Sequence, residues 1–271
     1  MPPFPPSLIG RVAIVTGANH GIGAATAIAL AQRGADVIAT YLQAYDPPGQ
    51  LPEYRSQRAL DGAHVIAAVE AIGRRCVAIE LDLVDPAAPS ELFAQAEAAI
   101  GPVSVLVHNA SGWRKDSFAN GGSDGIGRPN YAVTAATVDA QLHVDARAGA
   151  LLMQEFITRH RRRGADWGRI VTLTSGTGGG FPGEVSYGAA KAALISYTMS
   201  AASEMAADGV TANVIYPPVT DTGWVTDEVR AFVAGDADHH HVADPTEVAE
   251  VIAWLCADAG RIVTGNVIRL R

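Results

Sequence analysis

The sequence is poor in cysteine, in cationic residues and in long apolar runs. Its two cysteines, Cys76 and Cys256, are too few for a disulfide framework, and we expect both to be small core residues in a reducing compartment. Lys and Arg number 20 against 28 Asp and Glu, a formal charge of −8, which argues against a broad cationic surface for nucleic acid. No apolar run approaches the roughly 20 residues of a membrane span, and the N-terminus lacks the charged and apolar regions of a signal peptide. We therefore expect a cytoplasmic protein without nucleic-acid or membrane partners.

A run of basic residues and a run of histidines suggest nucleic-acid binding and metal binding, but each has a simpler interpretation. The basic run 159–163 follows a long segment of apolar periodicity, where cations suit the partial negative charge of the last helical turn. The adjacent histidines His239, His240 and His241 cannot readily converge on one metal ion, and no nearby cysteine or suitably spaced histidine completes a site. We predict that the basic run ends a helix, and that the three histidines lie in a mobile loop and bind no metal.

Apolar, β-branched runs alternate with Ala-rich helical stretches along the whole chain. This alternation is typical of repeated strand–helix units, which form a parallel sheet with helices on both faces. It predicts a doubly wound α/β fold of seven strands in a single domain over residues 1–271, with residues 1–9 flexible. The expected strands are Val12–Thr16, Asp36–Thr40, Cys76–Ile79, Val103–Val107, Arg169–Thr174, Thr211–Ile215 and Ile262–Leu270. The expected helices are Ile22–Arg33, Ala59–Gly73, Pro89–Ile100, Ala135–Arg162, Tyr187–Ala207 and Thr246–Ala257.

Two predicted connections are longer than the roughly 2–6 residues usual in such folds. Thr40–Gly62 contains Pro47-Pro48-Gly49, and Gly112–Asn130 carries five glycines and Pro129. Both leave the carboxyl ends of predicted strands, where open α/β sheets bind their ligands. We interpret the first as a cofactor-side segment and the second as a substrate-side segment.

A strand, three glycines and a helix follow one another near the N-terminus. Gly17, Gly21 and Gly23 stand between the strand Val12–Thr16 and an Ala-rich stretch. Gly17 permits a tight turn, Gly21 lets backbone approach a pyrophosphate, and Gly23 lets helix and strand pack closely, while free N–H groups at the helix start face the anion. The spacing is G-x3-G-x-G rather than G-x-G-x-x-G, and it is the strand before and the helix after that make the turn a dinucleotide site.

With Thr16-Gly17-x3-Gly21-x-Gly23 the sequence resembles the short-chain dehydrogenase/reductase family, in particular its 3-oxoacyl-acyl-carrier-protein reductases, and further matches follow in family order over nearly the whole chain. The resemblance implies a Rossmann-type fold and an NAD(P)-dependent oxidoreductase. Asp82-Leu83 resembles the family's adenine-contacting element, with an acid at a helix N-terminus as the alternative, and Asn109-Ala110-Ser111-Gly112 resembles its N-A-G element beside the adenosine ribose. The cofactor-binding residues implied by the resemblance are Gly17, Asn19, His20, Gly21, Ile22, Gly23, Tyr41, Asp82, Leu83, Asn109, Ala110, Ser111, Tyr187, Lys191, Pro217, Val219, Thr220 and Thr222.

The end of the second predicted strand bears on the choice of nicotinamide cofactor. NAD selectivity usually rests on a carboxylate there, which accepts hydrogen bonds from the adenosine ribose and repels a 2′-phosphate. Thr40 and Tyr41 occupy this region instead. His20, Arg55 and Arg58 can add positive character beside it, although the two arginines are equally well explained as solvated loop charges. We therefore expect NADP(H) in preference to NAD(H).

Tyr187-Gly188-Ala189-Ala190-Lys191 supplies the candidate acid–base group. The i,i+4 spacing places phenol and ammonium on one face of a helix. A free phenol has a pKa of about 10, which a lysine cation and a positive nicotinamide ring would shift toward working pH, so that Tyr187 exchanges a proton with a carbonyl or alcohol oxygen. Ser175, at the end of the predicted strand before, can hold that oxygen against the phenol. Ser175, Tyr187 and Lys191 in this order resemble the family's catalytic set, in which the lysine also contacts the nicotinamide ribose.

Two positions depart from the family pattern. Where relatives carry a helix Asn that positions a water in the proton relay, this chain has Asp145, whose carboxylate accepts a hydrogen bond but donates none. Asp145 is consistent with a variant fourth catalytic residue, with a purely structural residue, or with lost activity. After the sixth predicted strand Pro218 replaces the family's glycine, so that turn must differ. The chain also lacks the Asp-Gly-Gly tail of many relatives, which puts any tetramer contact through that tail in doubt.

The stretch 221–244 corresponds to the substrate lid of the family. Its apolar side chains Trp224, Val225, Phe232 and Val233 favour a nonpolar or acyl-type carbonyl, such as a 3-oxoacyl group.

The long helices Ala135–Arg162 and Tyr187–Ala207 correspond to those that relatives pair across subunits, so the resemblance implies a homotetramer or homodimer.

Three functions are consistent with these residues. The first is an oxidoreductase that transfers hydride between NADP(H) and a carbonyl or secondary alcohol, with Ser175, Tyr187 and Lys191 as its machinery. The second is a non-catalytic dinucleotide-binding protein, which Asp145 and Pro218 permit. The third is dehydration or epimerisation on the same scaffold. The intact set of serine, tyrosine and lysine favours the first.

Overall fold

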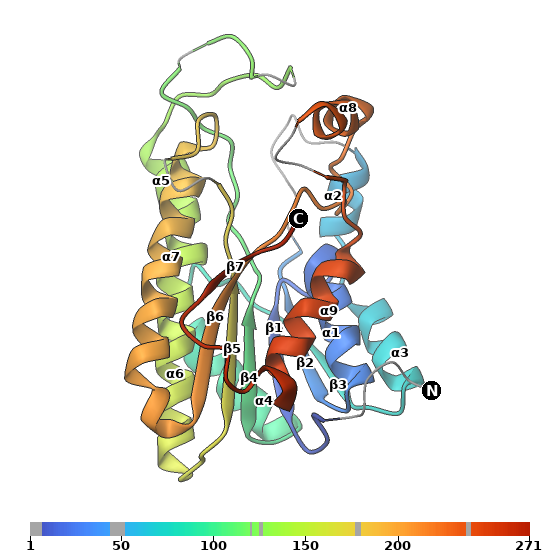
Figure 1. Cartoon of the computed structure of the whole chain (residues 1–271), viewed down its shortest axis with the longest axis vertical. Coiled ribbons are helices and arrows are strands. Elements are labelled where there is room, and N and C mark those ends of the chain that lie inside the picture. The colour runs from blue at the N-terminus through green and yellow to red at the C-terminus, as the bar shows by residue number, and fades with distance from the viewer. Residues whose placement is uncertain (1–6, 44–51, 120, 125–126, 177–179, 237–239) are drawn as a thin grey trace.

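In the computed structural model, which describes residues 7–43, 52–119, 121–124, 127–176, 180–236 and 240–271, seven strands form one sheet (Figure 1). The strand order is β3-β2-β1-β4-β5-β6-β7, and every neighbouring pair is parallel. This confirms the predicted Rossmann-type, doubly wound sheet. The strands are β1 Val12–Thr16, β2 Asp36–Tyr41, β3 Cys76–Glu80, β4 Val103–His108, β5 Gly168–Leu173, β6 Val210–Tyr216 and β7 Val267–Arg269.

Helices cover both faces of this sheet, with α1, α3 and α9 on one side and α4, α6 and α7 on the other (Figure 1). Successive residues of β4 point to opposite faces, so Val105 joins one apolar cluster and Leu106 the other. Burial on both faces is the reason that the central strands are continuously apolar in the sequence. The helices are α1 Gly21–Gln32, α2 Pro52–Arg58, α3 Ala63–Ala71, α4 Ala88–Ala99, α5 Ala135–Gln141, α6 Ala148–Arg162, α7 Val185–Glu204, α8 Asp227–Gly235 and α9 Pro245–Cys256, with short 3-10 turns at Ala206–Asp208 and Asp258–Gly260.

The predicted helix Ala135–Arg162 is interrupted by a π-helical turn, η1, over Leu142–Arg147. In a π turn the backbone hydrogen bonds span five residues instead of four, and such turns are frequent at functional sites. Asp145 lies within η1 and is fully buried. The single long helix predicted from the sequence is therefore three elements, and the interruption falls at the residue that departs from the family pattern.

Other boundaries differ where a glycine turns the chain. The predicted helix Ala59–Gly73 begins only at Ala63, because Gly62 has a left-handed φ of +80°. The predicted last strand Ile262–Leu270 shrinks to β7, since Gly265 before it has a φ of +70°. The predicted connection after β2 contains α2.

The segment just before β1 packs against the fold at Leu8. Leu8 is fully buried, and its N–H donates to the carbonyl oxygen of Arg33 over 2.8 Å. The flexibility expected for residues 1–9 stays a prediction. Residues 1–6 lie outside the described residues. Among the helices that the structure describes, none combines the length and apolar character needed to cross a membrane.

The strand order reverses at β1. From β1 the chain moves outward to β2 and β3, and then returns to β4 on the other side of β1. In doubly wound sheets such a reversal opens a crevice at the carboxyl ends of the two central strands, where ligands bind. The start of α1, α2, α8 and the segment after β4 all stand at this end of the sheet (Figure 1).

Candidate active site

The carboxyl ends of the strands gather the residues that the sequence singles out. The turn after β1 and the start of α1 carry Gly17, Asn19, His20, Gly21, Ile22 and Gly23; Tyr41 ends β2; Asp82 and Leu83 follow β3; Asn109, Ala110 and Ser111 follow β4; Ser175 follows β5; Tyr187 and Lys191 lie on α7; and Pro217, Val219, Thr220 and Thr222 follow β6. Parallel strands bring all of these segments to one edge.

The glycines of the turn after β1 stand where there is no space for a side chain. A Cβ on Gly23 would lie 2.1 Å from the carbonyl oxygen of Gly17, and one on Gly21 would lie 2.7 Å from the methyl group of Thr222. The Asn109 amide group donates to the carbonyl oxygens of Thr16 and Gly17 over 3.1 and 2.9 Å. The turn thus presents bare backbone at its glycines, is held by Asn109 and opens into α1, an arrangement that fits a dinucleotide pyrophosphate.

A buried histidine joins this turn to the π-helical turn. The Thr16 hydroxyl oxygen accepts the N–H groups of Asn109 and Ala110, each over 3.0 Å, so its proton is free to donate to Nδ1 of His108, also 3.0 Å away. Nε2–H of His108 then donates to the carbonyl oxygens of Val144 and Asp145 over 3.2 and 3.3 Å. Burial, and then the nearby Lys191 cation, lower the His108 pKa to about 4, so the ring is neutral at physiological pH.

Sequence reasoning missed His108. Its signal was a polar side chain at the end of the apolar run Val105-Leu106-Val107, immediately before Asn109.

The Asp145 carboxylate is held on both oxygens. Oδ1 lies 2.8 Å from the Lys191 ammonium, and Oδ2 accepts the Ser111 hydroxyl over 3.1 Å and the Gly112 N–H over 3.0 Å. Both members of the ion pair are almost fully buried, with 0% of the Asp145 side chain and 3% of the Lys191 side chain exposed. Asp145 therefore anchors Lys191 directly and ties the lysine to the segment after β4.

Tyr187 and Ser175 meet beside this ion pair. The Lys191 ammonium lies 5.5 Å from the centre of the Tyr187 ring. Burial, together with the Asp145 and Glu184 charges, raises the phenol pKa well above 10, and a hydrogen bond with the Ser175 side chain opposes the increase. In the protein alone the Lys191 charge is matched by Asp145. The expectation that Lys191 and a positive nicotinamide ring together shift this pKa toward working pH stays a prediction.

Positive and negative side chains both lie in the region between the glycine turn, α2 and the end of β2, where the adenosine of a cofactor is expected. Asn19 donates to the carbonyl oxygens of Arg58 and Leu60 over 3.2 and 2.9 Å, which holds the end of α2 against the glycine turn. Burial, and then Arg58, lower the His20 pKa to about 4, so the His20 ring and the Arg58 cation are close neighbours. Arg55 on the same helix is exposed. Burial, and then Glu80 and Asp61, raise the pKa of Tyr41, so acidic side chains border the other side of this region.

Asp82 is not at the start of a helix. Its carboxylate accepts the N–H of Val84 over 2.9 Å in a local turn, and α4 begins only at Ala88. The alternative role for Asp82 as a helix N-terminal acid is therefore wrong.

The segment after β6 uses its two threonines differently. Thr222 packs against Gly21 of the dinucleotide turn. The Thr220 hydroxyl donates to the carbonyl oxygen of Pro218 over 2.9 Å, and Thr220 is 5% exposed. Of the two, Thr222 is the better placed to meet a cofactor.

No group of three or more His, Cys, Asp or Glu side chains within the described ranges is arranged to hold a metal ion. His241 lies 3.3 Å from the Glu247 carboxylate, and His239 lies outside the described residues.

Comparisons with known proteins agree with this geometry. A family model described as enoyl-(acyl carrier protein) reductase matches residues 17–270. The chain is 34% identical over 266 residues to cis-4-hydroxycyclohexanecarboxylate dehydrogenase of Sinomonas cyclohexanicum, covering 95% of this chain and 94% of that one. It is 28% identical over 271 residues to the 3-oxoacyl-acyl-carrier-protein reductase of Escherichia coli (strain K12), covering 96% of each. The structure of a short chain dehydrogenase from Burkholderia cenocepacia J2315 in complex with NADP is similar over 97% of each chain, with a TM-score of 0.79 and 30% identity.

The chain therefore belongs to the short-chain dehydrogenase/reductase family, whose members are NAD(P)-dependent oxidoreductases.

Proposed function

We propose that this protein is an NADP(H)-dependent carbonyl reductase or alcohol dehydrogenase in which Tyr187 transfers the proton. The observation that carries the proposal is the meeting of Tyr187 with the Ser175 side chain, next to the buried Lys191, at the edge that also holds the bare glycine turn. A phenol and a second hydroxyl that share one carbonyl oxygen can both position it and protonate it.

Each of the three side chains has a separate role beside the bound cofactor. A bound nicotinamide supplies or accepts the hydride. Tyr187 donates its proton to the carbonyl oxygen during reduction, and its raised pKa keeps it protonated near neutral pH. The Ser175 hydroxyl donates to the same oxygen and holds it in place. Lys191, which Asp145 fixes at 2.8 Å, is in position to bind the nicotinamide ribose.

We propose NADP(H) as the cofactor because Arg58 and His20 lie together beside the glycine turn, and because Tyr41 stands where NAD-selective sites carry a carboxylate. An arginine is well suited to bind a 2′-phosphate through two hydrogen bonds. The relative from Burkholderia cenocepacia was solved with NADP.

A nonpolar or acyl-type carbonyl, such as a 3-oxoacyl group, is the proposed substrate class. The segment 221–244 is the proposed lid, and residues 237–239 within it lie outside the described residues. In α8 of this segment Val229 and Val233 are buried, while Phe232 is 48% exposed. One relative is named a cis-4-hydroxycyclohexanecarboxylate dehydrogenase and another a 3-oxoacyl-acyl-carrier-protein reductase. The ring of the first substrate and the acyl chain of the second are apolar, although the first also carries a carboxylate.

We also propose a cytoplasmic enzyme that forms a homodimer or homotetramer through α6 and α7. The two cysteines are free and buried, which is compatible with a reducing compartment.

A non-catalytic dinucleotide-binding protein is the second candidate. The observation in its favour is the direct Asp145–Lys191 pair, which occupies the ammonium and, through the Asp145 charge, opposes ionisation of Tyr187. The two candidates differ in turnover, since both bind cofactor.

The test combines cofactor binding with a panel of carbonyl substrates. NADPH binding is measured by fluorescence, and NADPH oxidation is followed with 3-oxoacyl thioesters, cyclic ketones and aldehydes. We expect Tyr187→Phe to lower kcat by about 100-fold or more with little change in NADPH affinity. Tyr197→Phe is the matched control, because Tyr197 lies on the same helix and is 47% exposed. NADPH binding without oxidation by any carbonyl would support the second candidate, and full activity of Tyr187→Phe would overturn the first.

A further inference from the structure

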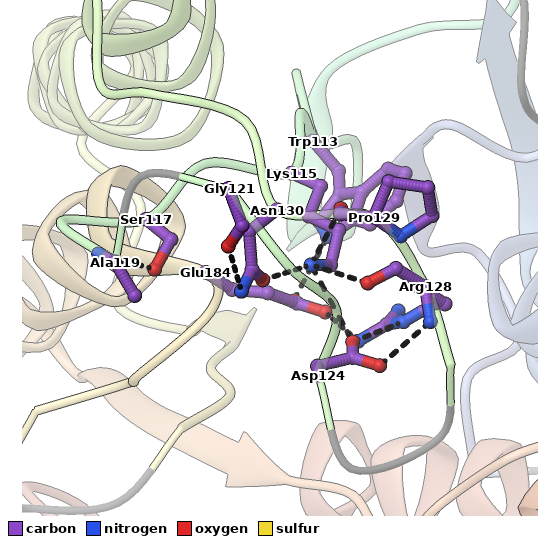
Figure 2. Close-up of polar contacts among 10 residues, drawn as sticks. All are labelled: Trp113, Lys115, Ser117, Ala119, Gly121, Asp124, Arg128, Pro129, Asn130 and Glu184. Carbon is purple, nitrogen blue, oxygen red and sulfur yellow. Dashed lines mark hydrogen bonds and ion pairs between the residues drawn. The ribbon is translucent and has the colours of Figure 1, made fainter.

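The segment Gly112–Asn130 is inserted between β4 and α5, and its residues 120, 125 and 126 lie outside the described residues. Its described part is built around a lysine whose side chain is buried. The Lys115 ammonium donates to Asn130 Oδ1 over 2.8 Å and to the carbonyl oxygen of Pro129 over 2.9 Å, and lies 3.5 Å from the Asp124 carboxylate, with 6% of its side chain exposed (Figure 2). Arg128 donates to the same Asp124 carboxylate over 2.8 Å. The described part of the segment therefore has a defined internal structure.

The segment is attached to the first residues of the helix that carries Tyr187. Asp116 is fully buried, its carbonyl oxygen accepts the N–H of Val185 over 3.1 Å, and its carboxylate accepts the N–H of Ser186 over 2.9 Å as well as the Ser186 hydroxyl. The residue before α7, Glu184, makes no side-chain cap of its own. Asp116 thus caps α7 from a different part of the chain, and its negative charge suits the helix N-terminus.

Glu184 is the second attachment point. Its Oε2 accepts Nε1–H of Trp113 over 2.9 Å, and its Oε1 accepts Nη2–H of Arg128 over 2.9 Å (Figure 2). Only 10% of the Glu184 side chain is exposed. Both carboxylate oxygens are therefore used to hold the inserted segment, from both of its ends, at a point three residues before Tyr187.

We propose that Glu184 is a positioning residue, through which the inserted segment and its Arg128 hold the first turn of α7, and with it the Tyr187 phenol, in place. The buried carboxylate needs Arg128 as its counter-charge. The inserted segment, which borders the substrate side, and the proton donor Tyr187 then move as one unit. The paired charges of Arg128 and Glu184 in turn act on the Tyr187 phenol.

Electrostatics support this assignment. The groups that act on the Tyr187 phenol are Asp145 from η1, Glu184 just before α7, Ser175 after β5 and Tyr54 from α2. The Lys191 ammonium of α7 lies 5.5 Å from the centre of the Tyr187 ring. After burial and Asp145, the Glu184 charge is the next largest contribution that raises the pKa of the phenol. We therefore expect loss of the Glu184 charge to ease ionisation of Tyr187. Loss of Arg128 leaves the Glu184 charge without its counter-charge at 2.9 Å, and we expect it to hinder that ionisation.

The first readout, which rests on the proposed function, is the pH dependence of kcat/KM for alcohol oxidation, the direction in which the phenol must lose its proton. We expect the rising limb to move to lower pH in Glu184→Gln and to higher pH in Arg128→Gln, with Arg128→Lys closer to the wild type. Trp113→Phe removes one hydrogen bond but no charge, and is expected to leave the limb in place. Glu204→Gln, a matched change at the exposed far end of α7, serves as control.

The second readout needs no turnover. Hydrogen exchange is measured for the backbone N–H groups of Asp124 and Asn130, which are bonded inside the segment, and for that of Ser117, which is bonded to Tyr131 just after it. It is also measured for the first turn of α7. We expect exchange about tenfold faster in Glu184→Gln and Arg128→Gln, the factor that corresponds to loss of a charge-assisted hydrogen bond, and no change in Glu204→Gln.

The outcomes separate this inference from the proposed function. A wild type that shows no turnover overturns the proposed function, and the exchange data still decide whether Glu184 holds the segment. An active wild type whose two charge variants leave the limb in place, or move it in the same direction, overturns the role of Glu184 in tuning Tyr187. Unchanged exchange in both variants overturns the attachment itself.

Discussion

The Asp145 carboxylate lies 2.8 Å from the Lys191 ammonium, with both side chains almost completely buried. Two opposite charges that are paired away from water remain stable only together, because each alone would lose its hydration without compensation. In this protein the pair also sets the surroundings of Tyr187, since the Asp145 charge is a major cause of the raised phenol pKa. Asp145 therefore affects both folding and chemistry.

Replacement of Asp145 by alanine should destabilise the protein strongly. The change leaves the Lys191 ammonium buried without its partner, and the Ser111 hydroxyl and Gly112 N–H lose their acceptor. We expect a loss of about 3–5 kcal/mol in the free energy of unfolding, measured by urea denaturation. Asp145→Asn keeps an acceptor oxygen and is expected to lose less. An alanine variant as stable as the wild type would mean that the ion pair is not formed in solution.

The same asparagine variant should change the pH profile. Because the Asp145 charge raises the pKa of Tyr187, its removal is expected to lower that pKa and to move the rising limb of alcohol oxidation to lower pH. The profile is measured as kcat/KM against pH. A limb that stays in place, with Tyr187 shown to be essential, would assign Asp145 to structure alone.

The strands and the glycine turn could be predicted because their signals are local. The apolar run of β1 and the spacing of Gly17, Gly21 and Gly23 lie within a few residues, and the structure places β1 at the predicted bounds. The family resemblance then supplied Ser175, Tyr187 and Lys191 in order. No long-range contact had to be known.

What escaped prediction depends on contacts between distant segments. The interruption at η1 does not alter apolar periodicity, so the sequence read as one continuous helix. Lys191 was expected to act on the phenol because the two share a helix, whereas its partner Asp145 comes from another element. Glu184 likewise gave no signal, because its two partners, Trp113 and Arg128, lie in the irregular segment after β4.

Arg58 offers a test of cofactor choice. If its guanidinium binds the 2′-phosphate, Arg58→Gln should weaken NADPH binding by about tenfold or more and change NADH binding little, since a hydrogen bond to a charged group contributes about 1.5–3 kcal/mol. Arg55→Gln is the control, because Arg55 lies on the same helix and is exposed. Both dissociation constants are measured by fluorescence titration. Equal losses for NADPH and NADH would remove Arg58 from the phosphate site.

Gly23 tests the dinucleotide turn. The Cβ of an alanine at this position would lie 2.1 Å from the Gly17 carbonyl oxygen and 2.6 Å from the Asn109 amide nitrogen, so the turn must shift. We expect Gly23→Ala to abolish NADPH binding and to lower the free energy of unfolding by about 1–3 kcal/mol. Gly235→Ala is the control, because a Cβ there meets nothing within 4 Å. Undiminished NADPH affinity in Gly23→Ala would show that the cofactor does not use this turn.

His108 should make the protein sensitive to mild acid. Its pKa is lowered from 6.5 to about 4 in the folded state, so between these values the unfolded chain binds the proton and the folded one does not. Proton binding therefore stabilises the unfolded state as the pH falls below 6.5, and the free energy of unfolding decreases progressively down to about pH 4. The loss attributable to His108 approaches about 3 kcal/mol.

His108→Asn isolates this contribution. An asparagine amide offers a donor and an acceptor but does not titrate, so the variant should be less stable than the wild type at neutral pH and should lose less stability as the pH falls from 6.5 toward 4. His20, whose pKa is also lowered to about 4, is present in both proteins, and its contribution cancels in the difference. Unfolding free energies are measured by urea denaturation across this range. Parallel curves for the two proteins would show that His108 is not held neutral between Thr16 and the carbonyl groups of η1.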